Sequence, residues 1–146
     1  MDTVSKKKRS EIMSRIRSKN TKPEMLVRKY LSSKGYKYSL HDKRLPGKPD
    51  IVLKRKKIAI QVRGCFWHGH NCKLSNYPKT NRKYWKNKIN NNKKRDKKND
   101  KLLRKIGYKL IIINECKINK KINFWCYCIK KARYLILRNL CNLWKY

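Results

Sequence analysis

Apolar residues near the start of the 146-residue chain recur with the period of an α-helix. Ile12, Met13 and Ile16 follow this spacing, and Ser10 has the side chain of a helix N-cap. The surrounding residues are mostly polar and basic. Residues 1–20 therefore indicate a basic arm that carries one short helix.

The next segment carries a clearer helical pattern. Pro23 favours the first turn of a helix, Leu26 and Tyr30 belong to an apolar stripe, and Gly35 follows where the stripe stops. The pattern predicts a helix that begins near residue 22. Residues 36–40 then read as a short strand.

A β-hairpin is expected in the middle of the chain. The apolar triplets 51–53 and 58–60 flank a basic turn, and a Pro-Gly loop over residues 41–50 precedes them. This arrangement places Asp50 at the mouth of the hairpin.

The second half alternates between polar and apolar segments. Residues 81–106 are rich in lysine and asparagine and predict one or two exposed helices, with a disordered middle as the alternative. Residues 108–114 predict a buried strand, and residues 122–146 a helix that packs on the core. With no internal repeat and no flexible linker, the order of elements predicts one mixed α/β domain.

The amino-acid composition indicates what kind of molecule the protein binds. The chain has 43 lysines and arginines against 8 acids, a formal charge of +35, which indicates a polyanion and first of all nucleic acid. It argues against a cationic ligand or an acid-rich extracellular module. A hydrophobic fraction of 39% is enough for a small core.

The chemical state of the cysteines depends on the cellular compartment. No apolar segment follows the start, and the longest aliphatic run, residues 110–113, is too short to span a membrane. We therefore expect a reducing, intracellular location without membrane association. In such a location we expect the six cysteines to be metal ligands or free thiols and not to form disulfides.

Four residues suggest a zinc site. Cys65, His70 and Cys72 lie within one short loop, and Cys116 directly follows the strand predicted over residues 108–114. Three thiolates and one imidazole make a closed tetrahedral zinc site that would join the loop to the sheet. The alternative is a set of buried, reduced cysteines with a surface histidine.

Asp50 suggests a second metal. A carboxylate at the mouth of a hairpin can hold Mg²⁺ against a phosphodiester. Restriction-type nucleases follow such an aspartate with an acid-x-Lys triplet, but here the triplet is Gln61-Val62-Arg63. Arginine stays protonated and cannot act as a general base. The alternative is an ordinary turn aspartate after proline.

The loop also holds a second histidine and an aromatic pair. His68 is suited to activating water or to protonating a leaving oxygen, or else it supports the zinc ligands. Phe66 and Trp67, with Trp85 further along, suit insertion into a base stack. The alternative for these aromatics is burial beneath the loop.

The motifs that contain these residues occur together in one known family. The segments LPGKPDIV, RGCFWHGHNC, YPKTNRKYW and KRDKKNDKLLRKIGYKLIIINEC resemble the very short patch repair (Vsr-type) DNA mismatch endonucleases, as does the opening RSEIMSRIRSKNTKPEMLVRKYL. The resemblance is nearly continuous from Arg9 to Cys116. It implies a restriction-endonuclease-like fold, a mixed sheet flanked by helices, with a structural zinc site.

The resemblance also implies a reaction and its residues. The enzyme would nick one DNA strand beside the thymine of a T·G mispair, using Mg²⁺. Asp50 would bind Mg²⁺ together with the backbone carbonyl of Val62, His68 would be the catalytic histidine, and Glu24 would support the water shell of the metal.

Further residues match the zinc ligands and the DNA-contacting groups of that family. The zinc ligands would be Cys65, His70, Cys72 and Cys116. The aromatic residues entering the DNA would be Phe66, Trp67 and Trp85, while the arm around Ile12, Met13 and Ile16 would grip the opposite groove.

Two features depart from the family pattern. Arg63 stands where the family usually has histidine, so we expect it to contact phosphate and to slow or alter cleavage. The tail after Cys116, with Cys126, Cys128 and Cys141, follows no pattern to which we attach a function.

We therefore expect a Mg²⁺-dependent mismatch endonuclease with a structural zinc. Its parts would be a DNA-gripping arm (1–20), a nuclease domain (21–118) and a helical tail (119–146). It would act as a cytoplasmic, nucleoid-associated monomer on duplex DNA with a T·G mispair, with mismatch-repair proteins as further partners.

Two alternatives stay open from the residues alone. One is a zinc-containing DNA-binding protein that has lost cleavage, and Arg63 and the unusual tail support it. The other is a restriction-like nuclease with another target. A ribosomal-type RNA-binding protein fits the charge but does not account for Asp50 beside a Cys/His loop.

Overall fold

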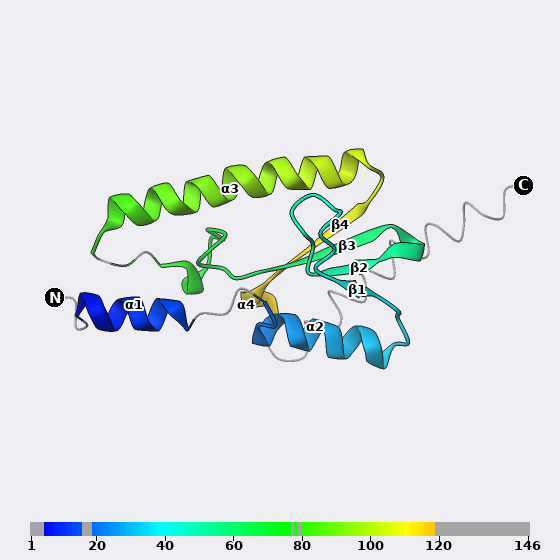
Figure 1. Ribbon diagram of the computed structural model, residues 1–146, viewed down its shortest axis with the longest axis horizontal. Coiled ribbons are helices and arrows are strands. Elements are labelled where there is room, and N and C mark those ends of the chain that lie inside the picture. Colours follow the sequence, from blue (N-terminus) through cyan, green and yellow to red (C-terminus); the bar gives the residue numbers. More distant parts are fainter. Residues whose placement is uncertain (1–4, 16–18, 77, 79, 119–146) are drawn as a thin grey trace, which may run out of the picture.

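The structure is a computed structural model that describes residues 5–15, 19–76, 78 and 80–118. Figure 1 shows these residues as a sheet with helices around it. Ile16 and the predicted helix over residues 122–146, with its three cysteines, lie outside the described residues.

Four strands form one mixed sheet in the order β1-β2-β3-β4. The strands are β1 (Ser39–Leu40), β2 (Ile51–Leu53), β3 (Ile58–Arg63) and β4 (Lys109–Asn114). The first three pair antiparallel, and β3 pairs parallel with β4. The predicted hairpin is therefore confirmed as β2 and β3, joined by a 3-10 turn over Lys54–Lys56.

β1 is shorter than the strand expected over residues 36–40. Only Ser39 and Leu40 pair with β2. Tyr36 and Tyr38 instead pack against the hydrophobic core while partly exposed. Their alternation with polar residues thus reflects core contact rather than pairing within the sheet.

The helices are α1 (Lys6–Ser14), α2 (Lys22–Ser33), α3 (Arg82–Lys105) and α4 (Glu115–Ile118). α2 matches the prediction, with the Thr21 hydroxyl accepting from the Glu24 N–H and with Gly35 at φ 72° after its end. The cap expected for α1 is wrong. Ser5 rather than Ser10 caps this helix by accepting from the Lys8 N–H, because the basic residues before Ser10 are helical too.

Figure 1 shows α2 on one side of the sheet and α3 on the other. One core cluster packs α2 against the sheet and α4. It consists of Val27, Tyr30, Leu31, Ile51, Leu53, Ile58, Ile60, Ile111, Ile113 and Ile118. Val52 and Ala59 alternate with these core residues and are also fully buried. They therefore face the side of the sheet that α3 covers.

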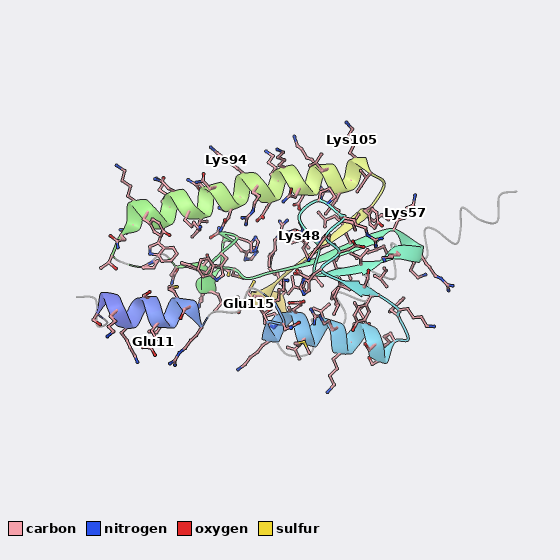
Figure 2. The ribbon with its side chains drawn as sticks, viewed as in Figure 1. Glu11, Lys48, Lys57, Lys94, Lys105 and Glu115 are labelled. Atoms are coloured by element: carbon pink, nitrogen blue, oxygen red, sulfur yellow. The ribbon has the colours of Figure 1, made fainter. Side chains whose placement is uncertain are left out.

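The lysine- and asparagine-rich segment is a single helix, α3, of 24 residues. Trp85, Ile89 and Leu103 form its buried stripe. Lys94 and Lys105 are exposed and extend outward in Figure 2. The buried stripe attaches α3 to the rest of the fold, and the exposed face carries much of the positive charge. Within the described part of the chain, no helix has the length and apolar character needed to cross a membrane.

Candidate active site and Cys/His cluster

An open cleft of about 530 Å³ lies between the end of β3, the loop before β2 and α3. It brings together four predicted site residues from different parts of the chain: Asp50, Val62, Arg63 and His68. Its polar and basic lining is completed by Lys43, Lys48, Gln61, Arg95, Asp96 and Asn99. Residues predicted for chemistry and for phosphate contact thus share one concave surface.

Asp50 enters this cleft at the start of β2. Its Oδ2 accepts a hydrogen bond of 2.8 Å from the Val62 N–H, which ties it to β3. Burial raises the pKa of Asp50, although the Val62 bond and the nearby His41, His68 and Arg28 act in the opposite direction. The site therefore holds a carboxylate whose charge is incompletely compensated by the protein.

Glu24 lies behind Asp50 rather than in the lining of the cleft. It is only 2% exposed, and its carboxylate pairs with Arg28 and lies 3.1 Å from His41 Nε2. Donor atoms of Glu24, His41 and Asp50 lie within 4.8 Å of one another, as a metal-binding group would. The structure thus brings Glu24 close to Asp50, as its predicted role requires.

His41 was not singled out from the sequence. Its Nε2 lies 3.0 Å from an Arg28 nitrogen, which can only donate, and 3.1 Å from the Glu24 carboxylate, which can only accept. Its Nδ1 lies 3.8 Å from Asp50 Oδ1. Burial lowers the pKa of His41, and the Arg28 charge adds to this effect against the attraction of Asp50. A neutral imidazole therefore links Asp50 to the Glu24–Arg28 pair.

His68 has a partner that sequence analysis also missed. Its Nδ1 lies 2.5 Å from Asp96 Oδ2 on α3. Burial would raise the pKa of Asp96, but the His68 bond and the Arg63 and Arg95 charges outweigh it and lower that pKa. Because an ionised carboxylate can only accept, Nδ1 carries the proton and Nε2 is free to accept another.

Arg63 directs its guanidinium to protein groups. It donates to Gln61 Oε1 at 2.5 Å and to Asp100 Oδ1 at 2.6 Å. Its side chain is only 14% exposed. The phosphate contact expected from the sequence stays a prediction, and the observed contacts join β3 to α3.

The four predicted zinc ligands meet in one cluster. Donor atoms of Cys65, His70, Cys72 and Cys116 lie within 4.8 Å of one another, which makes them a possible metal site. Burial raises the pKa of Cys65 to about 12, whereas the hydrogen bond with His70 lowers that of Cys72 to about 7. The cluster connects the Cys/His loop (residues 64–72) to α4, which directly follows β4.

The aromatic residues form a packed group beside this loop. Phe66 lies 5.1 Å from Trp67 and 5.2 Å from Trp85 between ring centroids, in edge-to-face contacts. Trp85 is buried, while Phe66 and Trp67 are only partly covered. Asn92 on α3 also donates to the Trp67 carbonyl at 3.0 Å. Trp85 thus supports the two rings that solvent can reach, and its own entry into DNA stays a prediction.

Known proteins resemble this chain over most of its length. A family profile described as DNA mismatch endonuclease Vsr matches residues 1–74. Type II nicking enzyme V.NmeAIP of Neisseria meningitidis is 48% identical over 120 residues, 82% of this chain and 86% of that protein.

Two further relatives extend the comparison. Type II nicking enzyme V.XorIIP of Xanthomonas oryzae is 41% identical over 118 residues, 81% of this chain and 87% of its own length. DNA mismatch endonuclease Vsr of Escherichia coli is 34% identical over 115 residues, 79% of this chain and 74% of its own length. The chain therefore belongs to the Vsr family of DNA mismatch endonucleases, which confirms the resemblance seen in its motifs.

Proposed function

We propose that this DNA endonuclease nicks one strand of duplex DNA beside the thymine of a T·G mispair, with Mg²⁺ as its catalytic metal. The observation that carries the proposal is the cleft that holds Asp50 and the His68–Asp96 pair together. Lys48 and Arg95 in its lining suit the phosphates of a DNA strand. The identity of the mispair rests on membership of the family.

The residues around Asp50 fit Mg²⁺. This ion prefers carboxylate and carbonyl oxygens, and Asp50 and Glu24 offer such oxygens within one small group. A cation there would also offset the burial that raises the pKa of Asp50. We propose that Asp50 and the Val62 carbonyl hold the ion and that Glu24 supports its water shell. When bound, Mg²⁺ supplies charge stabilisation to the reacting phosphate.

His68 is the proposed proton carrier. With its Nδ1 proton held by Asp96, its Nε2 is able to take a proton from water or, once charged, to return one to the leaving oxygen. Asp96 fixes the tautomer of the ring and stabilises its charged form, as a carboxylate does for histidine in other hydrolases.

The aromatic pair suits the recognition of a mispair. We propose that Phe66 and Trp67 enter the base stack while Trp85 supports them from below. A mispaired step costs less to unstack than a matched one, which favours the mismatch. On α1, Ile12 and Met13 are exposed hydrophobic residues, and we propose that this helix contacts the opposite groove.

The Cys/His cluster fits zinc better than a hard cation. Three sulfur ligands and one imidazole nitrogen are a usual donor set for structural zinc. A metal would also compensate for the burial of the Cys65 thiol. We propose that Cys65, His70, Cys72 and Cys116 hold zinc and thereby fix the loop that carries His68.

The larger organisation is proposed on the same basis. Residues 21–118 would form a nuclease domain of the restriction-endonuclease-like class, supported by a mixed sheet with helices on both sides. Residues 1–20 would form the arm, and residues 119–146 the tail. A cytoplasmic monomer that associates with the nucleoid and with mismatch-repair proteins stays a prediction.

The test is a nicking assay with end-labelled duplexes that differ at one base pair. We expect a single nick beside the thymine of T·G, and none in the T·A duplex of the same sequence. Cleavage of both strands of matched DNA would favour a restriction-like nuclease instead. Binding without any nick, by protein that contains zinc, would favour a DNA-binding protein that has lost cleavage.

A further inference from the structure

Asp96 and Asp100 are the two acids of α3, a helix otherwise rich in lysine and arginine. They lie four residues apart and so share one face of the helix. Asp96 pairs with His68, and Asp100 lies 2.6 Å from Arg63. Both acids of α3 therefore contact residues that lie at or just after the end of β3.

The Arg63–Asp100 contact is well enclosed. The two side chains are 14% and 11% exposed. Gln61, two residues earlier on β3, accepts two further bonds from the same guanidinium. Charged pairs that are shielded from water couple more strongly than exposed ones. This contact therefore constrains α3 more than a surface ion pair would.

The His68–Asp96 pair is more open on its histidine side. The His68 side chain is 27% exposed. Arg63 also lines a neighbouring hollow, which is bordered by the α3 cations Lys97, Lys101 and Arg104. Asp96 lines the same hollow, so without Asp100 the Arg63 charge would face these cations and would attract Asp96, the carboxylate that His68 uses.

We propose that Arg63 is a positioning residue, whose ion pair with Asp100 holds α3 at the register that places Asp96 beside His68. The inference rests on the proposed function, in which His68 carries the proton. It gives Arg63 a role within the protein instead of a phosphate contact. Nicking would then depend on the Arg63–Asp100 pair while the affinity for DNA would not.

A double-mutant cycle tests this role. Arg63→Gln, Asp100→Asn and the double variant would be compared in single-turnover nicking of the T·G duplex at saturating protein. We expect each single change to slow nicking about tenfold and the double change to slow it no further. The dissociation constant for the duplex, measured with Ca²⁺ in place of Mg²⁺, should stay within about twofold.

Two further variants separate positioning from general damage. Asp100→Glu keeps the charge and should restore most of the nicking rate. Arg55→Gln removes a cation from the exposed turn between β2 and β3 and should leave the rate unchanged. If Asp100→Glu were as slow as Asp100→Asn, the carboxylate would not act through Arg63 and the proposal would be wrong.

A spectroscopic measurement keeps this proposal separate from the proposed function. In protein with ¹⁵N-labelled histidine, the Nδ1 proton that His68 donates to Asp96 should give a proton NMR signal. We expect Arg63→Gln and Asp100→Asn to shift or broaden this signal while the amide spectrum stays that of a folded protein. An unchanged signal in both variants would overturn the proposal even if the wild-type protein did not nick.

The affinity measurement distinguishes the positioning role from a direct contact with DNA. Tenfold weaker binding by Arg63→Gln, with an unchanged rate at saturation, would make Arg63 a phosphate contact. Additive effects of Arg63→Gln and Asp100→Asn would mean that the two residues act independently. Either result would remove the positioning role.

Discussion

Asp50 combines a proposed role in binding Mg²⁺ with an environment that disfavours its charge. Burial raises the pKa of Asp50 in the folded state. Its favourable contribution to the free energy of unfolding is therefore complete only below the pKa that aspartate has in the unfolded chain, about 4. That contribution is lost as the pH rises through the pKa of Asp50 in the folded state. At neutral pH the ionised Asp50 therefore lowers the free energy of unfolding until a cation binds.

Asp50→Asn should consequently raise the melting temperature at pH 7 in Mg²⁺-free buffer. Each kcal/mol gained corresponds to about 2–4 °C in a chain of this size. The gain should disappear near pH 3, where the carboxyl is protonated in both states. Thermal unfolding followed at the two pH values checks this. A lower melting temperature for Asp50→Asn at pH 7 would contradict the account.

The aromatic residues should divide into two classes. Phe66→Ala should weaken binding of the T·G duplex about ten- to hundredfold, since stacking on a base is worth about 1–3 kcal/mol. Trp85→Ala should instead lower the free energy of unfolding by about 3–5 kcal/mol, because Trp85 is buried. Duplex titrations and urea unfolding of both variants separate these effects. A Phe66→Ala variant that binds normally would rule out insertion of this ring.

Single residues differed in how far the sequence revealed them. Asp50 and His68 stand in distinctive local motifs, so the sequence alone made them candidates for the site. His41 and Asp96 acquire their roles from partners that are distant in sequence. For Asp96 and Asp100 a signal existed, because two acids spaced by one helical turn are unusual in so basic a helix.

Among the elements, the turn that carries His68 depends on its contact with α3. Gly69 has φ 57°, and a Cβ built there would lie 2.7 Å from Ile89 Cγ2. Gly35 also has a positive φ, of 72°, but a Cβ there would meet nothing within 4 Å. Gly69 thus allows the loop to approach α3 closely, whereas Gly35 only allows the backbone to adopt a positive φ.

Gly69→Ala should therefore destabilise the protein by about 1–3 kcal/mol more than Gly35→Ala, the cost of overpacking beyond backbone strain. Urea unfolding of the two variants, with zinc present, gives the comparison. Equal losses for the two would mean that the loop does not need this close approach.

Element boundaries were less predictable than element types. The α2 helix and the β2–β3 hairpin have strong terminating signals, namely Thr21, Gly35 and the basic turn. α1 has serines at positions 5 and 10, and only the structure shows that Ser5 is the cap. The interior of α3 lacks apolar residues over more than two turns, so the sequence alone left its continuity open.

At the scale of the whole molecule, we expect charge to govern the strength of DNA binding. A formal charge of +35 implies that phosphate contacts dominate affinity. If six or more phosphates are contacted, binding should weaken about a thousandfold or more between 50 and 200 mM salt. Titrations of matched and T·G duplexes over this range check the expectation. A salt-independent affinity would exclude a binding mode based on phosphate contacts.

The central claim is that the Asp50 cleft performs Mg²⁺-dependent nicking. The most direct measurement is the single-turnover nicking rate on the T·G duplex for wild-type protein and Asp50→Asn, each with Mg²⁺ and without it. We expect a nick only with Mg²⁺ and a rate at least about a hundredfold lower for Asp50→Asn, with duplex binding retained. Equal rates for the two proteins, or nicking without Mg²⁺, would contradict it.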